Sequence, residues 1–354
     1  MDELPRAASL VIVGGGFAGA STAYWLARAG VKGVVVIERE AICGAHASGR
    51  NAALCRAIAD DDETTALTAR GAQFLASPPD GFARLLDRSG GILLADDDAG
   101  IAALVARAQR HAIAHERISI DQIVAHWPQL AGVRAAGGVS CPGDGVIDIG
   151  ALLTGYLDGA RRGGVRIVTS CELRAITPRG GGVAIETNRG SIEAKAVACA
   201  AGAWAGTVGA IAGSDARFTP IKRHLFVTQP PSTPAGAPWV WSLGREPFYA
   251  RREGSGLLLS GCDAREHAPA DVTPDDDARD MLAERIRRAA PGLGGLEVKR
   301  AWACLRTFAP DRRMHIAWDP MHPWLFWVAA LGGHGATASA AVGERAAAAL
   351  ALRL

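Results

Sequence analysis

The sequence predicts an α/β protein in which a discontinuous Rossmann-like nucleotide-binding domain carries an inserted, β-rich second domain. A glycine turn, "VGGGFAG", joins an apolar strand at 9–13 to a helix at 18–29. Another helix and strand follow at 148–169, and the chain ends on strand and helix in "LFWVAALGGHGATASAAVGERAAAAL". β-rich sequence separates these units. A dinucleotide site assembled from the beginning, middle and end of the chain explains this order better than two tandem domains.

The elements follow from apolar periodicity and from turn and capping residues. A strand at 33–37 completes the first βαβ unit, and residues 60–109 read as helical around a short strand at 90–96. Asp148 can cap a helix that runs to Arg162. Further predicted elements are strands at 165–169, 182–187, 190–193 and along "AKAVACAAGAW", β-rich sequence at 218–263, and a charged amphipathic helix at 271–290.

Composition and charge exclude several classes of protein. The 354 residues carry a formal net charge of +2 without clustered Lys and Arg, so a nucleic-acid footprint is not expected. The seven cysteines form no CxxC pair, which argues against a zinc site or a disulfide framework. The first residues are polar, and no apolar run reaches the roughly 18 residues of a membrane span. We therefore expect a cytoplasmic protein without a transmembrane segment.

The glycine turn predicts contacts with the phosphates of a dinucleotide. Gly14, Gly16 and Gly19 fit GxGxxG, in which the glycines allow a tight turn, close approach of a pyrophosphate, and close packing of helix on strand. Glu38 ends the second strand, where its carboxylate can accept hydrogen bonds from ribose hydroxyls and disfavours NADP. This pattern alone leaves FAD and NAD unresolved. The adjoining expected contacts are Phe17, Ala18 and Arg39.

Four further motifs follow in order: "GAHASGRN" at 44–51, "CAAGAW" at 199–204, "CLRTFAPD" at 304–311 and "LGGHGATASAAVGE" at 331–344. With the glycine turn they resemble the D-amino-acid oxidase family of flavoproteins over essentially the whole chain. Together with "SPPDGF" and "EPFYARR", they make the likeness greatest to bacterial D-arginine dehydrogenases. The resemblance implies an FAD-binding domain made of residues 1–80, 140–215 and 301–354, and a substrate-binding domain made of 81–139 and 216–300.

The resemblance also implies where FAD is held. Small residues that open the last helix can bring free N–H groups to the flavin, whose reduced form carries negative charge that a helix N-terminus stabilises. The segment at 44–51 passes the flavin ring and phosphates, and "AAGAW" closes the turn beneath the pyrophosphate. Beyond the glycine turn, the candidate FAD contacts are Ala47, Ser48, Gly49, Arg50, Asn51, Leu173, Ala201, Gly202, Trp204, Gly332, Gly333, Gly335, Ala336 and Thr337.

The resemblance implies the reaction of this family, in which the Cα hydrogen of an amino acid passes to flavin N5 as a hydride. The imine that remains is then hydrolysed to the oxo acid. A planar arginine fork orients the substrate carboxylate best. Arg306 matches the family's carboxylate arginine, Tyr249 a tyrosine that covers the substrate, and Arg223 a second substrate arginine. His46 matches a histidine near the flavin, and His334 lies at the flavin edge.

The sequence departs from its relatives at three places. Where the D-arginine enzyme has a glutamate that reads the guanidinium, Arg84 stands here, so we expect a neutral or acidic substrate side chain. Where sarcosine-oxidase-like members carry a lysine that assists the reaction with oxygen, this chain has apolar Leu257–Leu259, which favours a dehydrogenase. Cys304 stands at the spacing of a covalent flavin linkage, although non-covalent FAD is the main expectation.

The resulting hypothesis is FAD-dependent oxidative deamination of an amino acid, D- or of glycine or N-methyl type, with a quinone- or dye-type acceptor or O2. One alternative is an O2-using amine oxidase similar to sarcosine or glycine oxidase. Another is a flavin-binding module whose cofactor is structural. His111 and His115 share a predicted helix but have no third ligand nearby, so no metal is expected.

Overall fold

The glycine turn lies at the centre of a sheet built from distant parts of the chain. The computed structural model describes residues 3–231 and 233–354. In this first sheet β1 pairs in parallel with β2 and β12, and β12 pairs in parallel with β20. Its strands are β1 (Ala7–Val13), β2 (Val34–Ile37), β9 (Arg166–Val168), β10 (Leu173–Arg179), β11 (Gly182–Thr187), β12 (Gly190–Cys199), β19 (His315–Trp318) and β20 (Leu325–Ala329).

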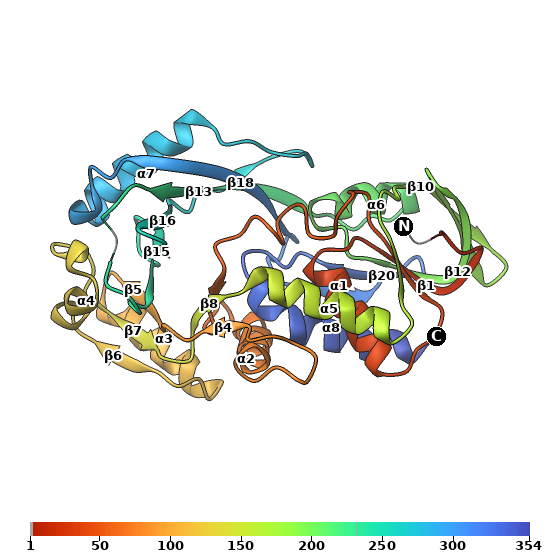
Figure 1. Cartoon of the computed structure of the whole chain (residues 1–354), viewed down its shortest axis with the longest axis horizontal. Coiled ribbons are helices and arrows are strands. Elements are labelled where there is room, and N and C mark those ends of the chain that lie inside the picture. Colours follow the sequence, from red (N-terminus) through yellow and green to blue (C-terminus); the bar gives the residue numbers. More distant parts are fainter. Residues whose placement is uncertain (1–2, 232) are drawn as a thin grey trace.

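Alternate side chains of β1 and β2 enter different cores because successive strand residues point to opposite faces. Leu10 and Ile12 pack beneath helices, whereas Val11 and Val13 pack on the other side with β10–β12. Figure 1 shows α1, α5 and α8 side by side over the first sheet. The helices that cover the sheet are α1 (Phe17–Arg28), α5 (Ile149–Arg162), α6 (Ala205–Ala212) and α8 (Gly335–Ala351). Helix α2 (Asp62–Ala76) packs on α8, and the short helix η2 (Gly202–Trp204) contacts β18 and α6.

A second sheet forms the other lobe in Figure 1. Its order is β17-β13-β16-β15-β14-β5-β7-β6, and β18 pairs with β13. Its strands are β5 (Gly91–Ala95), β6 (Glu116–Ile118), β7 (Gly137–Cys141), β13 (Thr219–Thr228), β14 (Trp239–Ser242), β15 (Phe248–Glu253), β16 (Gly256–Ser260), β17 (Arg265–Glu266) and β18 (Val298–Phe308).

A small sheet, β3-β8-β4, lies between the lobes. Its strands are β3 (Leu54–Cys55), β4 (Leu86–Asp87) and β8 (Gly145–Ile147). The remaining helices are α3 (Asp98–Arg110), α4 (Ile120–His126), α7 (Asp276–Ala289), η1 (Pro128–Leu130) and η3 (Pro291–Leu293). Within the described ranges, none of the helices is both long and apolar enough to cross a bilayer.

The predicted α/β class and its discontinuous nucleotide-binding sheet are confirmed. Asp148 caps α5 as expected, because its side chain accepts a 2.8 Å hydrogen bond from the Ala151 N–H. The predicted strand at 190–193 and the next one are a single strand, β12, whose first half pairs with β11 and whose second half pairs with β1 and β20. The boundary proposed at residue 300 falls inside β18, which pairs along most of its length with β13.

Candidate functional site

A cavity of about 290 Å³ opens between the two sheets. It begins at the glycine turn and extends to β13, β18 and the start of α8. Of the FAD contacts and catalytic residues predicted from the sequence, Gly19 and Gly49 lie outside its lining. Those that line it are Gly14, Gly16, Phe17, Ala18, Glu38, Arg39, His46, Ala47, Ser48, Arg50, Asn51, Leu173, Ala201, Gly202, Trp204, Arg223, Tyr249, Arg306, Gly332, Gly333, His334, Gly335, Ala336 and Thr337.

The glycine turn admits no larger residue at two of its positions. Gly14 has φ +109°, and a Cβ there would lie 2.5 Å from the carbonyl oxygen of Ala200. A Cβ on Gly19 would lie 1.9 Å from the carbonyl oxygen of Gly14. Gly19 therefore shapes the pocket from behind, by letting α1 approach the turn, and this is the packing task that the motif assigns to it.

Glu38 organises the turn through both of its carboxylate oxygens. Oε2 accepts a 2.7 Å hydrogen bond from the Gly15 N–H, and Oε1 accepts one of 2.9 Å from the Glu40 N–H. Each oxygen keeps a second lone pair, so the expected bond to a ribose hydroxyl stays a prediction. The carboxylate is thus positioned at the end of β2 before any ligand arrives.

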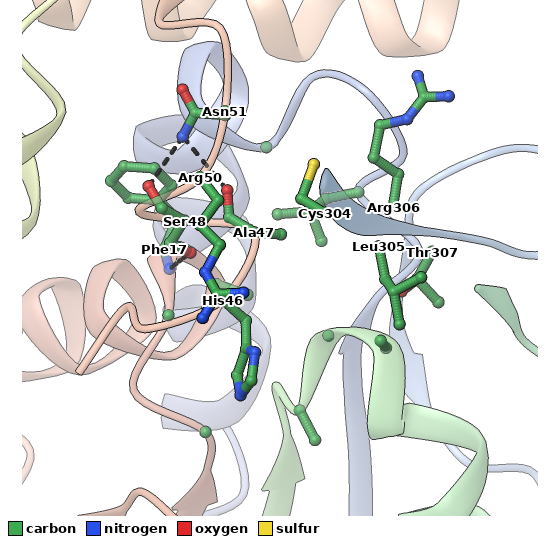
Figure 2. Close-up of a pocket in the computed structure, with 18 of the residues that line it drawn as sticks. Phe17, His46, Ala47, Ser48, Arg50, Asn51, Cys304, Leu305, Arg306 and Thr307 are labelled. Atoms are coloured by element: carbon green, nitrogen blue, oxygen red, sulfur yellow. Dashed lines mark hydrogen bonds between the residues drawn. The ribbon is translucent and has the colours of Figure 1, made fainter. Parts of the chain in front are cut away.

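The segment at 44–51 folds against the first turn of α1. The Ser48 hydroxyl accepts a 2.9 Å hydrogen bond from the Phe17 N–H, and the Asn51 amide donates to the carbonyl oxygens of Ala47 and Ser48 (Figure 2). Gly49 lies inside this turn, because a Cβ there would be 2.6 Å from the Gly44 carbonyl oxygen. Arg50 lines the pocket and forms an ion pair with Asp271.

His46 belongs to a polar cluster at the β2 end of the pocket. Its Nε2 lies 2.9 Å from Glu40 Oε1, and its ring centroid is 4.6 Å from that of Trp204. The Arg39 guanidinium carbon lies 4.1 Å from the Trp204 ring centroid. Figure 2 shows His46 well apart from the Arg306 guanidinium. His46 therefore lies at the end of the pocket near β2, away from the arginines. Its catalytic role stays a prediction.

The pairing of β13 with β18 places the candidate substrate arginines on one face. Arg223 is directly opposite Cys304, and Arg306 follows Cys304 by two residues. Paired residues and i, i+2 neighbours share a sheet face, so all three side chains point the same way. Figure 2 shows Cys304 and Arg306 on one side of β18, with Leu305 and Thr307 on the other.

Arg306 lacks a counter-ion among the described residues. Its Nε is buried without a hydrogen-bond partner there, and no described acid forms an ion pair with it. Burial and the nearby Arg223 charge lower the pKa of Arg306 to about 10. Arg223 is 6% exposed; its Nε donates a 2.7 Å hydrogen bond to the Asp263 carbonyl oxygen, and its Nη1 lacks a partner within the described chain. Asp263 Oδ1, 3.8 Å from Arg223 Nε, compensates the Arg223 charge in part, so the unpaired charge of Arg306 is the one that calls for an anionic ligand.

Tyr249 stands beside these arginines on β15. It is 5% exposed and lines the pocket, and its ring centroid lies 4.8 Å from that of Trp241. Burial raises the pKa of Tyr249 despite the opposing charges of Arg223 and Arg306. The phenol therefore stays protonated and can donate a hydrogen bond to an anion held by the arginines.

The start of α8 meets Arg306 directly. A Cβ on Gly333 would lie 3.2 Å from Arg306 Nη1, and Gly332 takes φ +55°. The Ala338 N–H donates to the His334 carbonyl oxygen as the first bond of the helix, so the amides at 335–337 precede the intrahelical ladder. Helix N–H groups and a guanidinium thus face the same part of the pocket.

His334 is held in its neutral form. Burial and the Arg56 charge lower its pKa to about 4, while Asp60 opposes the shift. Between pH 6.5 and 4 the unfolded chain gains a proton that the folded chain does not, so stability falls as the pH falls. We expect the free energy of unfolding of His334→Asn, relative to wild type, to rise as the pH falls through this window, by at most about 1.4 kcal/mol per pH unit. Urea unfolding at several pH values measures this difference, and a difference independent of pH would contradict it.

The set of residues that line the substrate end of the pocket differs from the sequence-based expectation. Arg84 does not line the pocket: its side chain is 80% exposed and lies near Asp87, because the small sheet turns that loop outward. Its predicted role in repelling basic substrates is therefore wrong. Two residues that were not among the sequence-based candidates, Arg56 and Trp241, do line the pocket. An arginine inside the apolar stretch "AALCRAIA" was the available signal for the first of them.

The structure also describes the other residues that the sequence singled out for the reaction with oxygen, for flavin attachment and for metal binding. Leu257–Leu259 are buried in β16 and do not line the pocket, and none of the described lining residues is a lysine. Cys304 is a buried free thiol whose pKa is raised by burial. In the part of the chain that the structure describes, no group of three or more His, Cys, Asp or Glu side chains gathers around a point that could hold a metal ion.

Comparison with known proteins shows to which protein family this sequence is similar. The family model described as DAO, FAD dependent oxidoreductase, matches residues 9–349. Mitochondrial dimethylglycine dehydrogenase of Rattus norvegicus is 29% identical over 278 residues, which cover 73% of this chain and 31% of the relative. Glycine oxidase of Bacillus licheniformis is 24% identical over 347 residues, 94% of this chain and 90% of that one. The chain thus spans about a third of the mitochondrial relative.

Solved structures share the fold over nearly the whole chain. L-proline dehydrogenase from P. horikoshii has a TM-score of 0.87 at 23% identity, covering 97% of this chain and 93% of that chain. Glycine oxidase from Geobacillus kaustophilus has a TM-score of 0.82 at 21% identity, covering 99% and 96%. This likeness confirms the fold that the sequence predicts.

Proposed function

Because the chain belongs to the DAO family of FAD-dependent oxidoreductases, we propose that it oxidises the carbon–nitrogen bond of an amino acid or a related amine carboxylate. The observation that carries this proposal is Arg306, an arginine with a buried Nε and no described counter-ion, set against the start of α8 and beside Tyr249. A substrate carboxylate supplies the missing negative charge. The finer resemblance to D-arginine dehydrogenases, and with it a D-configured substrate, stays a prediction.

The residues of the pocket fit FAD, the cofactor of this family. Gly14 and Gly16 leave a cradle that a Cβ would fill, since the Cβ of Gly16 would lie 2.9 Å from Ser48 Oγ. The N-termini of α1 and α8 lie at separate places along one pocket, which suits an anionic pyrophosphate and a ring that becomes negative on reduction. Bound FAD supplies the two-electron acceptor. We propose that it is held non-covalently, with Cys304 as a free thiol.

The chain's own residues bind and orient the substrate. Arg306 pairs with the carboxylate through its planar fork, and Tyr249 donates a hydrogen bond to the same group. Fixing the carboxylate at the wall formed by β18 and α8 aims the adjacent carbon along the pocket, and this positioning lowers the barrier to transfer. His334 is neutral, and the acidic lining residues described, Glu38 and Glu172, lie at β2 and at the start of β10. The amine must therefore react in its neutral form, without a strong protein base.

Dehydrogenase behaviour is favoured because the described pocket lining contains no lysine to assist a reaction with oxygen. We expect the visible absorbance of oxidised flavin to bleach when the purified, FAD-loaded protein is mixed anaerobically with its substrate from a panel of amino acids and N-methyl amino acids of both configurations. Admitting O2 then restores the absorbance slowly, and adding a quinone or dye restores it fast. A flavin that no member reduces would refute the proposed function, and fast recovery with O2 would identify an oxidase.

A further inference from the structure

Arg56 is a nearly enclosed cation in the pocket, and neither the glycine turn nor the proposed carboxylate site uses it. It is 2% exposed and lines the pocket just after β3. Its guanidinium carbon lies 4.5 Å from the Trp241 ring centroid. Its Nε is buried and has no hydrogen-bond partner in the described part of the chain. A buried guanidinium N–H without a partner calls for an explanation, and in a pocket wall a bound ligand is one.

The position of Arg56 is fixed from several sides. Its backbone N–H donates a 3.2 Å hydrogen bond to Thr337 Oγ1, and that hydroxyl donates a 3.1 Å hydrogen bond to the Leu54 carbonyl oxygen. Its Nη2 donates to Asp60 Oδ1 at 2.8 Å. The Arg56 backbone is therefore attached to the start of α8, and its side chain is attached to its own loop through Asp60. A guanidinium held in this way loses little freedom when it binds an anion.

Arg56 and the Arg223–Arg306 pair lie around one space. Trp241 connects them, because its ring contacts the Arg56 guanidinium on one side and the Tyr249 ring on the other. His334 lines the same pocket, and the charges of both Arg56 and Arg306 lower its pKa. An amino acid whose carboxylate is held by Arg306 and Tyr249 therefore has Arg56 as a second cation in the same pocket.

Nearby acids compensate the Arg56 charge only in part. The Asp60 side chain is 75% exposed, so solvent screens its charge. Asp144 lies close enough to feel the Arg56 charge, but burial raises its pKa to about 8, which leaves it largely protonated at neutral pH. Asp263 accepts hydrogen bonds from His224 at both carboxylate oxygens and lies 3.8 Å from Arg223 Nε, so its charge compensates that of Arg223. Arg56 and Arg306 thus keep charge that these acids do not fully compensate.

We propose that the substrate carries two anionic groups, an α-carboxylate bound by Arg306 and Tyr249 and a second carboxylate bound by Arg56. This inference rests on the proposed function and names its substrate class: a short dicarboxylic amino acid or dicarboxylic amine. Arginine suits the second carboxylate because its fork can donate two parallel hydrogen bonds. A neutral amide cannot replace this charge-assisted pairing, and a basic side chain is repelled.

The wild-type, FAD-loaded protein provides the first test. Anaerobic flavin reduction is followed with aspartate, glutamate and iminodiacetate, and with asparagine and glutamine as neutral matches of the first two, in both configurations. We expect kcat/KM for the best acid to exceed that of its matched amide by about 10- to 100-fold, the value of one charged hydrogen-bond pair. An acid-to-amide ratio near one, with the flavin reduced by neutral amino acids, overturns this inference and leaves the proposed function intact.

Variants of Arg56 then test whether this residue causes the preference for acidic over amide substrates. Arg56→Gln should lower the acid-to-amide ratio to near one, and Arg56→Lys, which keeps the charge but loses the fork, should give an intermediate ratio. Arg84→Gln is the matched control, since the same change is made on an 80% exposed side chain outside the pocket, and its ratio should equal that of wild type. If Arg56→Gln fails to retain FAD, the Arg56→Lys ratio decides. A wild-type ratio in Arg56→Lys or Arg56→Gln overturns the assignment.

Discussion

Replacing Arg306 by Met lowers the kcat/KM of flavin reduction by about 30- to 5,000-fold, the equivalent of the 2–5 kcal/mol lost when one partner of a buried charged pair is truncated. The loss follows because the planar fork of Arg306 lies against Gly333 at the start of α8 and has no counter-ion among the described residues, and methionine keeps neither the charge nor the fork. Arg306→Lys should recover part of the affinity and little of the orientation. Anaerobic stopped-flow reduction of the FAD-loaded variants measures both effects.

The Arg306→Met variant should not be less stable than wild type. The folded state depresses the pKa of Arg306 to about 10, so folding disfavours the charged form at every pH below that value. Removing the charge relieves this penalty, and we expect the unfolding midpoint of Arg306→Met without substrate to equal or exceed that of wild type. Arg300→Met, on the same strand but 63% exposed, is the control and should change neither property. Full activity in Arg306→Met would reject the carboxylate role.

Gly19→Ala abolishes retention of FAD and lowers the unfolding midpoint strongly. The added Cβ would lie 1.9 Å from the Gly14 carbonyl oxygen and 3.2 Å from Ile12 Cγ2, so α1 must move away from the glycine turn. Overpacking a tight site costs about 1–3 kcal/mol, and this contact with backbone belongs at the upper end. The ratio of flavin to protein absorbance after purification, together with thermal unfolding, gives the result.

Gly143→Ala is the matched control, because a Cβ at that glycine meets no atom within 4 Å. It should bind FAD and unfold like wild type. Since Gly19 does not line the pocket, loss of FAD in Gly19→Ala alone would show that the packing behind the turn, and not only the amides facing the ligand, determines binding. Normal FAD content in Gly19→Ala would contradict the tight helix-to-strand contact.

Local signals predicted much of this fold. The glycine turn, the Asp148 cap and the apolar alternation of β1 depend on a few neighbouring residues, so the sequence alone was sufficient for them. The assignment of Arg223 and Arg306 to one site rests on family resemblance, and the β13–β18 register gives its physical cause. The confirmed family and fold leave the individual roles of these residues as predictions.

What the sequence did not predict depends on contacts between distant segments. Arg56 enters the pocket because Thr337, 281 residues away, accepts its backbone N–H. Arg84 is outside because β4 pairs with β8, which no local pattern specifies. Both are arginines that flank apolar residues. Only the tertiary pairing distinguishes the arginine that lines the cavity from the one in solvent.

The parallel pairing of β12 with β20 also makes the pocket a product of long-range folding. The glycine turn forms from neighbouring residues, but the wall that faces it is the start of α8, at Gly335 and beyond. Contacts between such distant segments close slowly, and until they close the sheet is incomplete and its strand edges are exposed. The two ends of the pocket therefore come together only when the whole first sheet has formed.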